Sequence, residues 1–265
     1  MAFFDKALVR ACACSLLAAA CTTHSDREGA GTQDALPRSQ AERIIDASIA
    51  FHGGDLYNDA ELGFDLDGQS YRVARVDDSY RYTAHDKNAG REVYRELNNL
   101  GYFEHLNGKM LELSAEDSSS QAGDIHASVY FALLPFSLDD PQLQAEYLGE
   151  DSLDGRAYHR LGIRNEDGFG LQEGLAEFLY WFDTESFRLD YLAHSLAAKE
   201  GTRFRKALNS RRVNGIVFQD YEVFRGPGID SLHMIAELYA SDRLLSISRK
   251  TLSGIFVKAQ YEFKE

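Results

Sequence analysis

The sequence has few cysteines, and all three stand close to its N-terminus. Cys12 and Cys14 fall within a leader-like stretch described below, so Cys21 is the one cysteine expected in the mature chain. A single cysteine can form neither an intramolecular disulfide nor a thiolate metal cluster. We therefore expect no disulfide framework and no metal held by cysteine.

Basic residues are also scarce. The chain carries 28 lysines and arginines against 42 aspartates and glutamates, which gives a formal charge of −14. A nucleic-acid partner needs a basic face to meet its phosphates, so this balance argues against nucleic-acid binding. It also disfavours simple electrostatic docking on anionic lipid.

The motifs of several common chemistries are missing. No Gly-x-Ser-x-Gly elbow, no His-Glu-x-x-His pair and no glycine-rich phosphate loop occurs, and none of the eight histidines has another four residues away. We expect no cofactor, no metal and no enzymatic activity. A hydrolase using His159 or His194 stays open as a third alternative, although both positions suit hydrogen-bonding residues on strands.

Proline is rare, with four residues in 265, while tyrosine and phenylalanine are abundant, with 14 and 16. Aromatic residues favour strands, so the composition indicates a β-rich protein. The length allows one large domain or two small ones. Aromatic side chains in this number fit a packed core and equally a sheet curved around an apolar cavity.

The first 20 residues have the order of a secretory signal peptide. Lys6 and Arg10 precede a small apolar run, which ends at residue 20 before Cys21 and is too short to span a membrane.

The end of this run resembles a bacterial lipobox, with Ala18 where leucine is usual, which implies lipidation of Cys21. The alternative is an ordinary cleaved signal with an unrelated cysteine. Residues 21–38 are polar and fit a tether, and the domain would then span 39–265.

The stretch 175–195 predicts a β-hairpin around the polar tetrad that begins at Asp183. On the first arm, Phe178, Tyr180 and Phe182 share one face, and Leu179 and Trp181 share the other, so this arm should be covered on both sides. On the second arm, polar residues such as Asp190 and His194 alternate with apolar ones. We expect that arm to have one solvated face.

Elsewhere, short alternating segments separated by turn dipeptides predict antiparallel neighbours with short links. A capping box at Ser39 predicts a helix that stops at Gly53. Apolar spacing predicts a helix over 125–134, a helical turn over 141–148 and a helix over 231–239. The expected strands lie near 62–66, 71–75, 80–84, 94–97, 102–106, 109–113, 156–163, 202–207, 215–218, 244–247 and 255–257.

Arg203 and Arg205 flank Phe204, so both guanidinium groups lie on one face of a predicted strand. One interpretation is a solvated face on which they pair with Asp190 and Asp220. The other is an arginine pair at a cavity mouth that binds a carboxylate or phosphate head in a bidentate manner.

A series of short motifs runs through most of the predicted mature chain. They lie at residues 52–54, 130–135, 140–141, 147–149, 158–159, 180–181, 189–193, 203–205, 214–216 and 220–221. In this order, over about residues 39–221, they resemble an uncharacterised family of bacterial envelope lipoproteins. More distantly, the helix, the antiparallel strands and the 181–185 hairpin resemble the LolA/LppX-like lipoprotein-carrier superfamily. That resemblance implies an unclosed half β-barrel whose short helices cover an apolar concave face.

The sequence thus predicts an α+β fold, mainly antiparallel β, in an exported and lipid-anchored envelope protein, expected on the periplasmic side of the outer membrane. We expect non-catalytic binding of a lipid or other apolar small molecule. The alternative is a structural or protein-interaction module with an envelope protein partner. The expected ligand-binding residues are Tyr130, Phe131, Trp181, Tyr191, Arg203 and Arg205.

Overall fold

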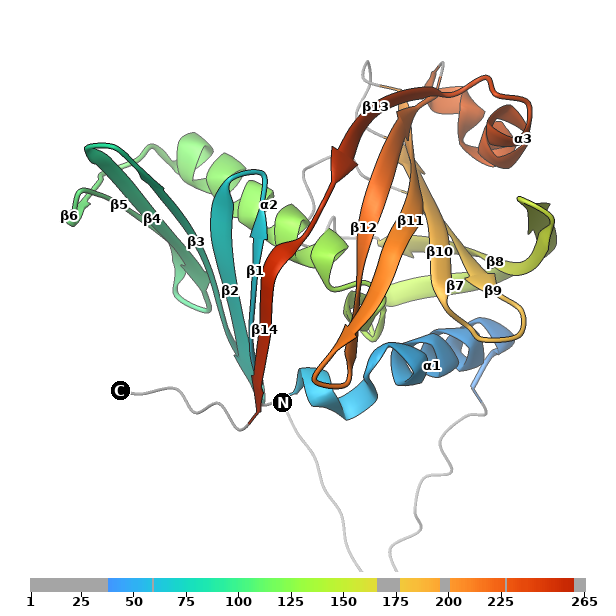
Figure 1. Ribbon diagram of the computed structural model, residues 1–265, viewed down its shortest axis with the longest axis horizontal. Coiled ribbons are helices and arrows are strands. Elements are labelled where there is room, and N and C mark those ends of the chain that lie inside the picture. The colour runs from blue at the N-terminus through green and yellow to red at the C-terminus, as the bar shows by residue number, and fades with distance from the viewer. Residues whose placement is uncertain (1–37, 59, 166–176, 196–200, 227, 260–265) are drawn as a thin grey trace, which may run out of the picture. The chain divides into compact units, whose positions relative to one another are not determined.

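Two antiparallel sheets of seven strands each form the framework (Figure 1). Sheet A has the strand order β14-β1-β2-β3-β4-β5-β6, and sheet B has the order β13-β12-β11-β10-β9-β8-β7. The strands are β1 (Ala60–Leu66), β2 (Gln69–Val76), β3 (Ser79–Asn88), β4 (Arg91–Asn98), β5 (Gly101–Leu106), β6 (Lys109–Met110), β7 (Leu143–Leu153), β8 (Arg156–Asn165), β9 (Glu177–Asp183), β10 (Leu189–Ser195), β11 (Thr202–Val213), β12 (Ile216–Arg225), β13 (Leu245–Lys250) and β14 (Ser253–Ala259).

The structure is a computed structural model that describes residues 38–58, 60–165, 177–195, 201–226 and 228–259. The predicted signal peptide, Cys21 and the tether up to residue 37 lie outside the described residues. Among the described residues, no helix is long and apolar enough to cross a membrane.

Hairpin turns join most neighbouring strands because the chain has turn residues at the required places. Asp67-Gly68, Asn107-Gly108 and Asn214-Gly215 all have positive φ at both positions, from 45° to 93°. Two-residue hairpin loops need this conformation, which glycine adopts without a steric penalty and asparagine or aspartate tolerates. The prediction of short links at turn dipeptides is confirmed at these three places.

Helix α1 (Gln40–His52) begins at the predicted capping box. The Ser39 side chain accepts a hydrogen bond from the Glu42 backbone, the Glu42 carboxylate accepts one from the Ser39 backbone, and Gly53 ends the helix. The other helices are α2 (Ala115–Ala132), α3 (Ile235–Ala240) and the 3₁₀ segments η1 (Gly54–Tyr57), η2 (Phe136–Leu138) and η3 (Ile229–Met234).

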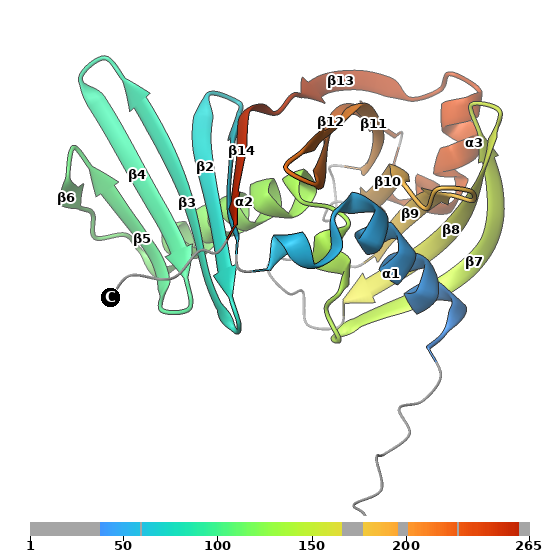
Figure 2. The ribbon, with the colours of Figure 1, turned by 60° about the horizontal axis from the view of Figure 1, so that its bottom comes forward.

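Helix α2 covers one face of sheet A and also reaches sheet B (Figure 2). Its Ile125 and Val129 share a buried cluster with sheet A residues such as Phe64 and with Ile216 and Phe218 of β12. The chain passes from the edge of sheet B to the edge of sheet A through residues 251–252, between β13 and β14. The two sheets are thus joined both by this shared apolar cluster and by the chain itself.

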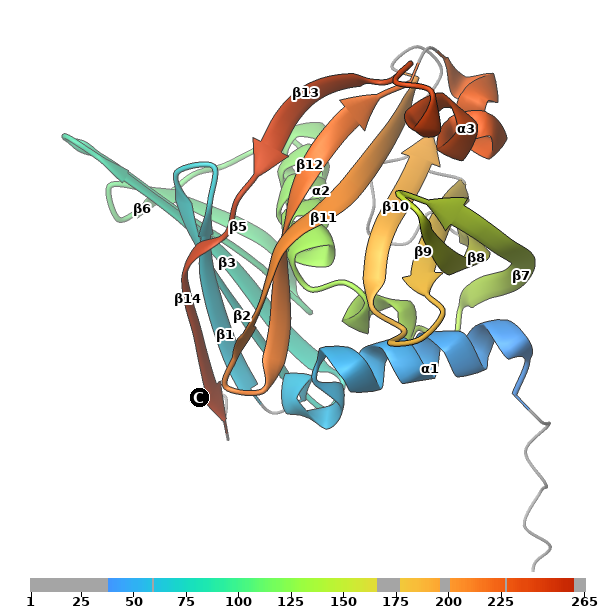
Figure 3. The same ribbon diagram turned by 45° about the vertical axis from the view of Figure 1, so that its right-hand side comes forward.

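Sheet B is covered on both faces. We call the face beneath α1 and the end of α2 the α1 face; it carries Phe178, Tyr180 and Phe182. The opposite face, beneath η3 and α3, is called the α3 face and carries Leu179 and Trp181. Figure 3 shows α1 beside the β9–β10 turn and α3 near the other end of these strands. The prediction that β9 is covered on both sides is confirmed.

The prediction of a solvated face on β10 is wrong. Asp190 is 7% exposed and His194 is 3% exposed. Leu189 pairs with Phe182 whereas Tyr191 pairs with Trp181, so Asp190 is the extra residue of a β-bulge. The bulge places Leu189 on the α1 face and Tyr191 on the α3 face, which alternation alone does not reveal.

Two helix predictions also needed correction. Helix α2 begins at Ala115, ten residues before the predicted start, with Ser114 as its N-cap. Most of its first turns are exposed, so they carry no apolar periodicity. Residues 143–148, predicted as part of a helical turn, belong to β7, because antiparallel pairing with β8 overrides the local pattern.

The fold class predicted from the sequence is confirmed. The described chain is mainly antiparallel β, in two unclosed sheets with three short α-helices. The division into two sheets, which share one buried cluster while sheet B has two more, is a feature that the strand pattern did not indicate.

The double coverage of β9 predicts a large cost for removing an apolar side chain there. Leu179 is 1% exposed, so Leu179→Ala should lower the free energy of unfolding by about 2–5 kcal/mol. Leu100, which is 86% exposed, provides the matched control, and Leu100→Ala should change it by less than about 0.5 kcal/mol. Urea denaturation of both variants measures the difference, and equal midpoints would contradict the proposed packing.

Candidate functional site: an arginine and aromatic cluster on sheet B

Aromatic side chains form a connected group on the α1 face. The Phe178 ring centroid lies 5.8 Å from that of Tyr180 and 6.0 Å from that of Tyr130 on α2. The hydroxyls of Tyr130 and Tyr180 share a hydrogen bond. Burial raises the pKa of both phenols, so they stay neutral at physiological pH.

Phe131 stands at the margin of this group and is partly exposed. Its ring meets Tyr130 edge to face at 5.3 Å and stacks on the His194 ring at 5.5 Å. The guanidinium carbon of Arg205 lies 3.7 Å from the Phe131 centroid, within the range of a cation–π contact. Phe131 therefore joins the apolar cluster to a cationic side chain.

Arg205 lies on β11, opposite Leu192 of β10 and Val223 of β12, which fixes its side chain on the α1 face. The side chain is half-buried, and its Nε atom is buried with no hydrogen-bond partner among the described residues. Burial lowers the pKa of Arg205 to about 10, so the group still carries its charge at neutral pH. A cation is thus held against an aromatic ring without a carboxylate of the described chain.

His194 is the second unusual polar group of this face. It is buried, and neither ring nitrogen has a hydrogen-bond partner in the part of the chain that the structure describes. Its ring lies between Phe131 and Phe178, with the Phe178 centroid at 5.2 Å. Burial, reinforced by the nearby Arg205, lowers the pKa of His194 to about 3, so the imidazole is neutral.

Three basic residues stand in one row across neighbouring strands. His194 pairs with Arg203, and Arg203 pairs with Arg225, so the three side chains share the α1 face with Arg205. The Arg203 guanidinium also donates a 3.3 Å hydrogen bond to the Thr202 carbonyl oxygen. Arg225 was not among the predicted binding residues, although its alternation with Tyr221 and Val223 on β12 could have identified it.

The structure separates the six predicted binding residues into two groups. Tyr130, Phe131, Arg203 and Arg205 lie on the α1 face, while Trp181 and Tyr191 lie in the buried cluster of the α3 face. On that face the Trp181 indole donates to Asp151 at 3.1 Å, and the Tyr191 hydroxyl donates to Asp154 at 2.8 Å. The six side chains therefore do not surround one common space.

The two acids considered as partners of the arginine pair are engaged elsewhere. Asp190 forms an ion pair with Arg188, and Asp220 forms one with Arg211 at 3.0 Å. The interpretation in which Arg203 and Arg205 pair with these two carboxylates is therefore wrong for the described contacts.

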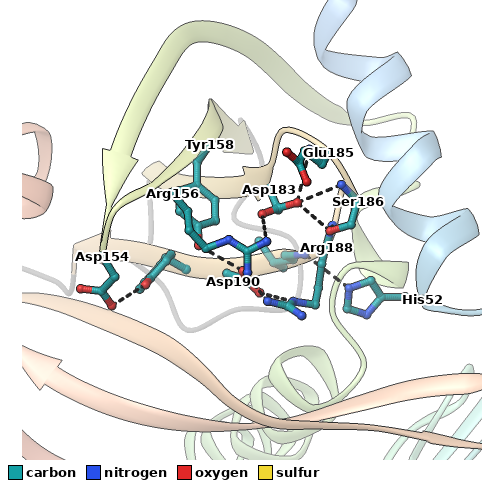
Figure 4. Close-up of polar contacts among 11 residues, drawn as sticks. His52, Asp154, Arg156, Tyr158, Asp183, Glu185, Ser186, Arg188 and Asp190 are labelled. Carbon is teal, nitrogen blue, oxygen red and sulfur yellow. Dashed lines mark hydrogen bonds and ion pairs between the residues drawn. The ribbon is translucent and has the colours of Figure 1, made fainter.

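A separate polar network holds the β9–β10 turn (Figure 4). Asp183 accepts hydrogen bonds from the Ser186 backbone and hydroxyl at 2.9 and 2.8 Å and forms a 2.8 Å ion pair with Arg156. Burial opposes ionisation of Asp183, but the hydrogen bonds from Ser186 and Glu185 and the charge of Arg156 together lower the pKa of this carboxyl. The network is well satisfied, so we assign it to the stability of the hairpin.

Asp190 and His52 connect this network to its surroundings. Asp190 accepts from Arg188 and from the Tyr158 hydroxyl at 3.2 Å. His52 Nε2 lies 3.4 Å from the Leu189 backbone nitrogen and accepts its hydrogen bond, which ties α1 to the hairpin. Burial, with Arg188 nearby, lowers the pKa of His52 to about 3.

The two histidines of the hydrolase alternative differ in their surroundings. The Nδ1 atom of His159 lies 3.5 Å from the Tyr147 hydroxyl and 3.7 Å from the Glu150 carboxylate, and its ring stacks on Phe187. Among the described residues, neither His159 nor His194 forms a hydrogen bond with the side chain of a serine or cysteine. The described residues also contain no group of three or more potential metal ligands.

The neutral imidazoles predict a pH dependence. Unfolding returns the pKa of His52 and His194 from about 3 towards 6.5, so the unfolded chain binds protons that the folded chain does not. Their contribution to stability is complete above pH 6.5 and is lost as the pH falls towards 3, by about 2 kcal/mol per histidine between pH 7 and 5. His194→Phe should remove about half of this loss.

His194→Gln serves as the matched control, because it also removes the titrating group but leaves an unpartnered polar side chain. It should flatten the pH dependence equally while being less stable than His194→Phe. Urea denaturation at pH 5, 6 and 7 measures both effects. An undiminished pH dependence in both variants would contradict the assignment of a buried neutral His194.

Several solved structures resemble this chain at low sequence identity. A LolA superfamily protein from Nitrosomonas europaea is 11% identical with a TM-score of 0.48, and the match covers 83% of this chain and 94% of that one. LprF from Mycobacterium bovis is 13% identical with a TM-score of 0.27, over 60% and 88% of the two chains. LppX from Mycobacterium tuberculosis is 13% identical with a TM-score of 0.24, over 58% and 87%.

No curated protein matches the sequence. A family model matches residues 64–245, which include α2, most of sheet A, most of sheet B and the arginine and aromatic cluster of its α1 face. The expected resemblance to an uncharacterised family is confirmed. The chain belongs to the family of unknown function DUF6503.

Proposed function

We propose that this protein binds a lipid or another apolar ligand, without catalysis, on the α1 face of sheet B. The observation that carries the proposal is the connected aromatic group that ends at the partly exposed Phe131. Large aromatic rings bury much apolar area and suit the lining of lipid sites. Phe131 and Tyr130 would contact the ligand, while Trp181 and Tyr191 would support β9 and β10 from the α3 face.

Buried polar atoms on this side of sheet B give further support. A buried polar group without a partner costs about 1–3 kcal/mol, so native proteins keep few of them. An occupant that offers hydrogen bonds among them would remove this cost. Atoms without a partner among the described residues include Ser48 Oγ and His52 Nδ1 on α1, both nitrogens of His194, Arg205 Nε, and the Gln219 amide atoms.

The proposed location follows from the N-terminal sequence. Residues 1–20 would direct export, Cys21 would carry the lipid anchor, and the tether up to residue 38 would hold the domain of residues 39–265 at the periplasmic side of the outer membrane. We also propose that the protein binds its ligand without a cofactor and without catalysing a reaction.

Native mass spectrometry tests ligand binding. The protein is purified from membranes in a mild detergent, which is removed in the gas phase. We expect a bound species of lipid mass that organic solvent releases. Phe131→Ala should reduce its occupancy severalfold, because the ring contributes apolar contact area at the proposed site. Phe103→Ala, at a similarly half-buried ring on β5 of sheet A, should leave it unchanged. A protein that stays without any such species after incubation with envelope lipids would refute the proposal.

A second candidate function, binding of an envelope protein, is favoured by β13. This strand ends sheet B, pairs with β12 on one side, and exposes Leu245 and Ile247 to 56% and 42%. An exposed edge strand with apolar side chains offers backbone groups to a strand of a partner.

Ile247→Lys tests this second function. A partner recovered in stoichiometric amount from crosslinked envelopes should be lost in this variant, because the charge opposes burial of the edge. Leu100→Lys, at an exposed apolar residue of the β4–β5 turn, should keep the partner. Loss in both variants, or in neither, would exclude β13 as the interaction surface.

A further inference from the structure

We infer that the ligand of the α1 face is an anionic amphiphile, whose carboxylate or phosphate head is held by Arg205 beside Arg203 and Arg225. This inference rests on the proposed function and specifies its ligand class. The apolar part would lie along Phe131 and Tyr130, and the head would meet the row of basic side chains.

The state of Arg205 indicates an anionic ligand. Its guanidinium keeps its charge, its Nε atom is buried, and no described residue accepts a hydrogen bond from this side chain. A buried charge without a partner is strongly unfavourable, and a hydrogen-bonded counter-ion offsets that cost. The carboxylate whose charge acts on Arg205 is that of Asp67, and it already forms an ion pair with Lys250.

Positive charge is concentrated on this part of sheet B. In a chain of formal charge −14, Arg203 and Arg225 stand directly opposite each other on β11 and β12, with Arg205 two residues along. Arg225 is exposed and forms no ion pair with a described residue, so it can meet a head group at the edge of the cluster.

Phe131 also contributes to the site. The guanidinium carbon of Arg205 lies over its ring, 3.7 Å from the centroid, and the N–H donors of a guanidinium lie in its own plane. The planar fork remains able to donate two parallel hydrogen bonds, the geometry that suits carboxylate and phosphate oxygens. The same ring offers its remaining surface to an alkyl chain, so one contact joins the two halves of an amphiphile.

Isothermal titration calorimetry of the purified protein tests this inference. Four probes are used: dodecanoate, dodecyl phosphate, dodecanol and inorganic phosphate. We expect the two amphiphilic anions to bind at least tenfold more tightly than dodecanol or inorganic phosphate. Arg205→Met should weaken the two anions by about 10- to 100-fold, the range expected for hydrogen bonds to a charged group. Dodecanol binding should change less than about threefold.

Arg91→Met is the matched control, because Arg91 is an exposed arginine on a strand of sheet A. This variant should bind all four probes with unchanged affinity. Arg225→Met covers the case in which Arg205→Met fails to fold, since Arg225 is exposed. It should weaken the anions by about two- to fivefold, as expected for exposed charge pairs. Raising the salt concentration should weaken the anions but not dodecanol.

The outcomes separate this inference from the proposed function. Equal affinity of the protein for dodecanol and dodecanoate would overturn the inference that the head group is anionic, while the proposed binding of an apolar ligand would stand. If inorganic phosphate bound as tightly as dodecyl phosphate, the site would be one for free anions, and the inference of an amphiphilic ligand would be overturned. Binding of none of the four probes would refute the proposed function itself. Unchanged anion affinity in both folded arginine variants would exclude these side chains as the head-group site.

Discussion

The burial of the β9–β10 hairpin between two apolar layers is the constraint on which the rest of sheet B depends. Phe178, Tyr180 and Phe182 need cover on one face, and Leu179 and Trp181 need it on the other. Helix α1 and the end of α2 supply the first layer, and η3 with α3 supplies the second. A strand that is apolar on both faces cannot stand at a solvated surface, so segments far apart in the sequence must meet around it.

That burial also decides the state of the polar groups nearby. At the turn, Asp183 and Asp190 are buried and have hydrogen bonds from Ser186, Arg188 and Tyr158, which makes their charges tolerable. At the other end of β10, His194 is held in the aromatic cluster without such partners, as is Arg205 on the neighbouring strand β11. The contrast separates a structural network from a candidate binding site within a single sheet.

Much of the architecture could be predicted from local chemistry. The Asx-Gly turns, the capping box at Ser39 and the alternation on β9 each act over a few residues, and each was confirmed. The exposed first half of α2 and strand β7 were missed, because an exposed helix lacks apolar periodicity and β7 depends on pairing with β8. For the candidate site, the Arg203–Phe204–Arg205 alternation placed two guanidinium groups on one face, but its burial and neighbours could not be predicted.

The sequence by itself determined a mainly antiparallel β fold with short helices and a doubly covered central strand, because turn chemistry and side-chain alternation are local properties of the chain. Only the tertiary structure decided that Asp190 forms a bulge, that Trp181 and Tyr191 face away from Phe131, and that Arg225 stands beside Arg203. Those facts depend on strand register and on which helix covers which face. Register is set by contacts between residues far apart in the sequence, so no single segment contains the information.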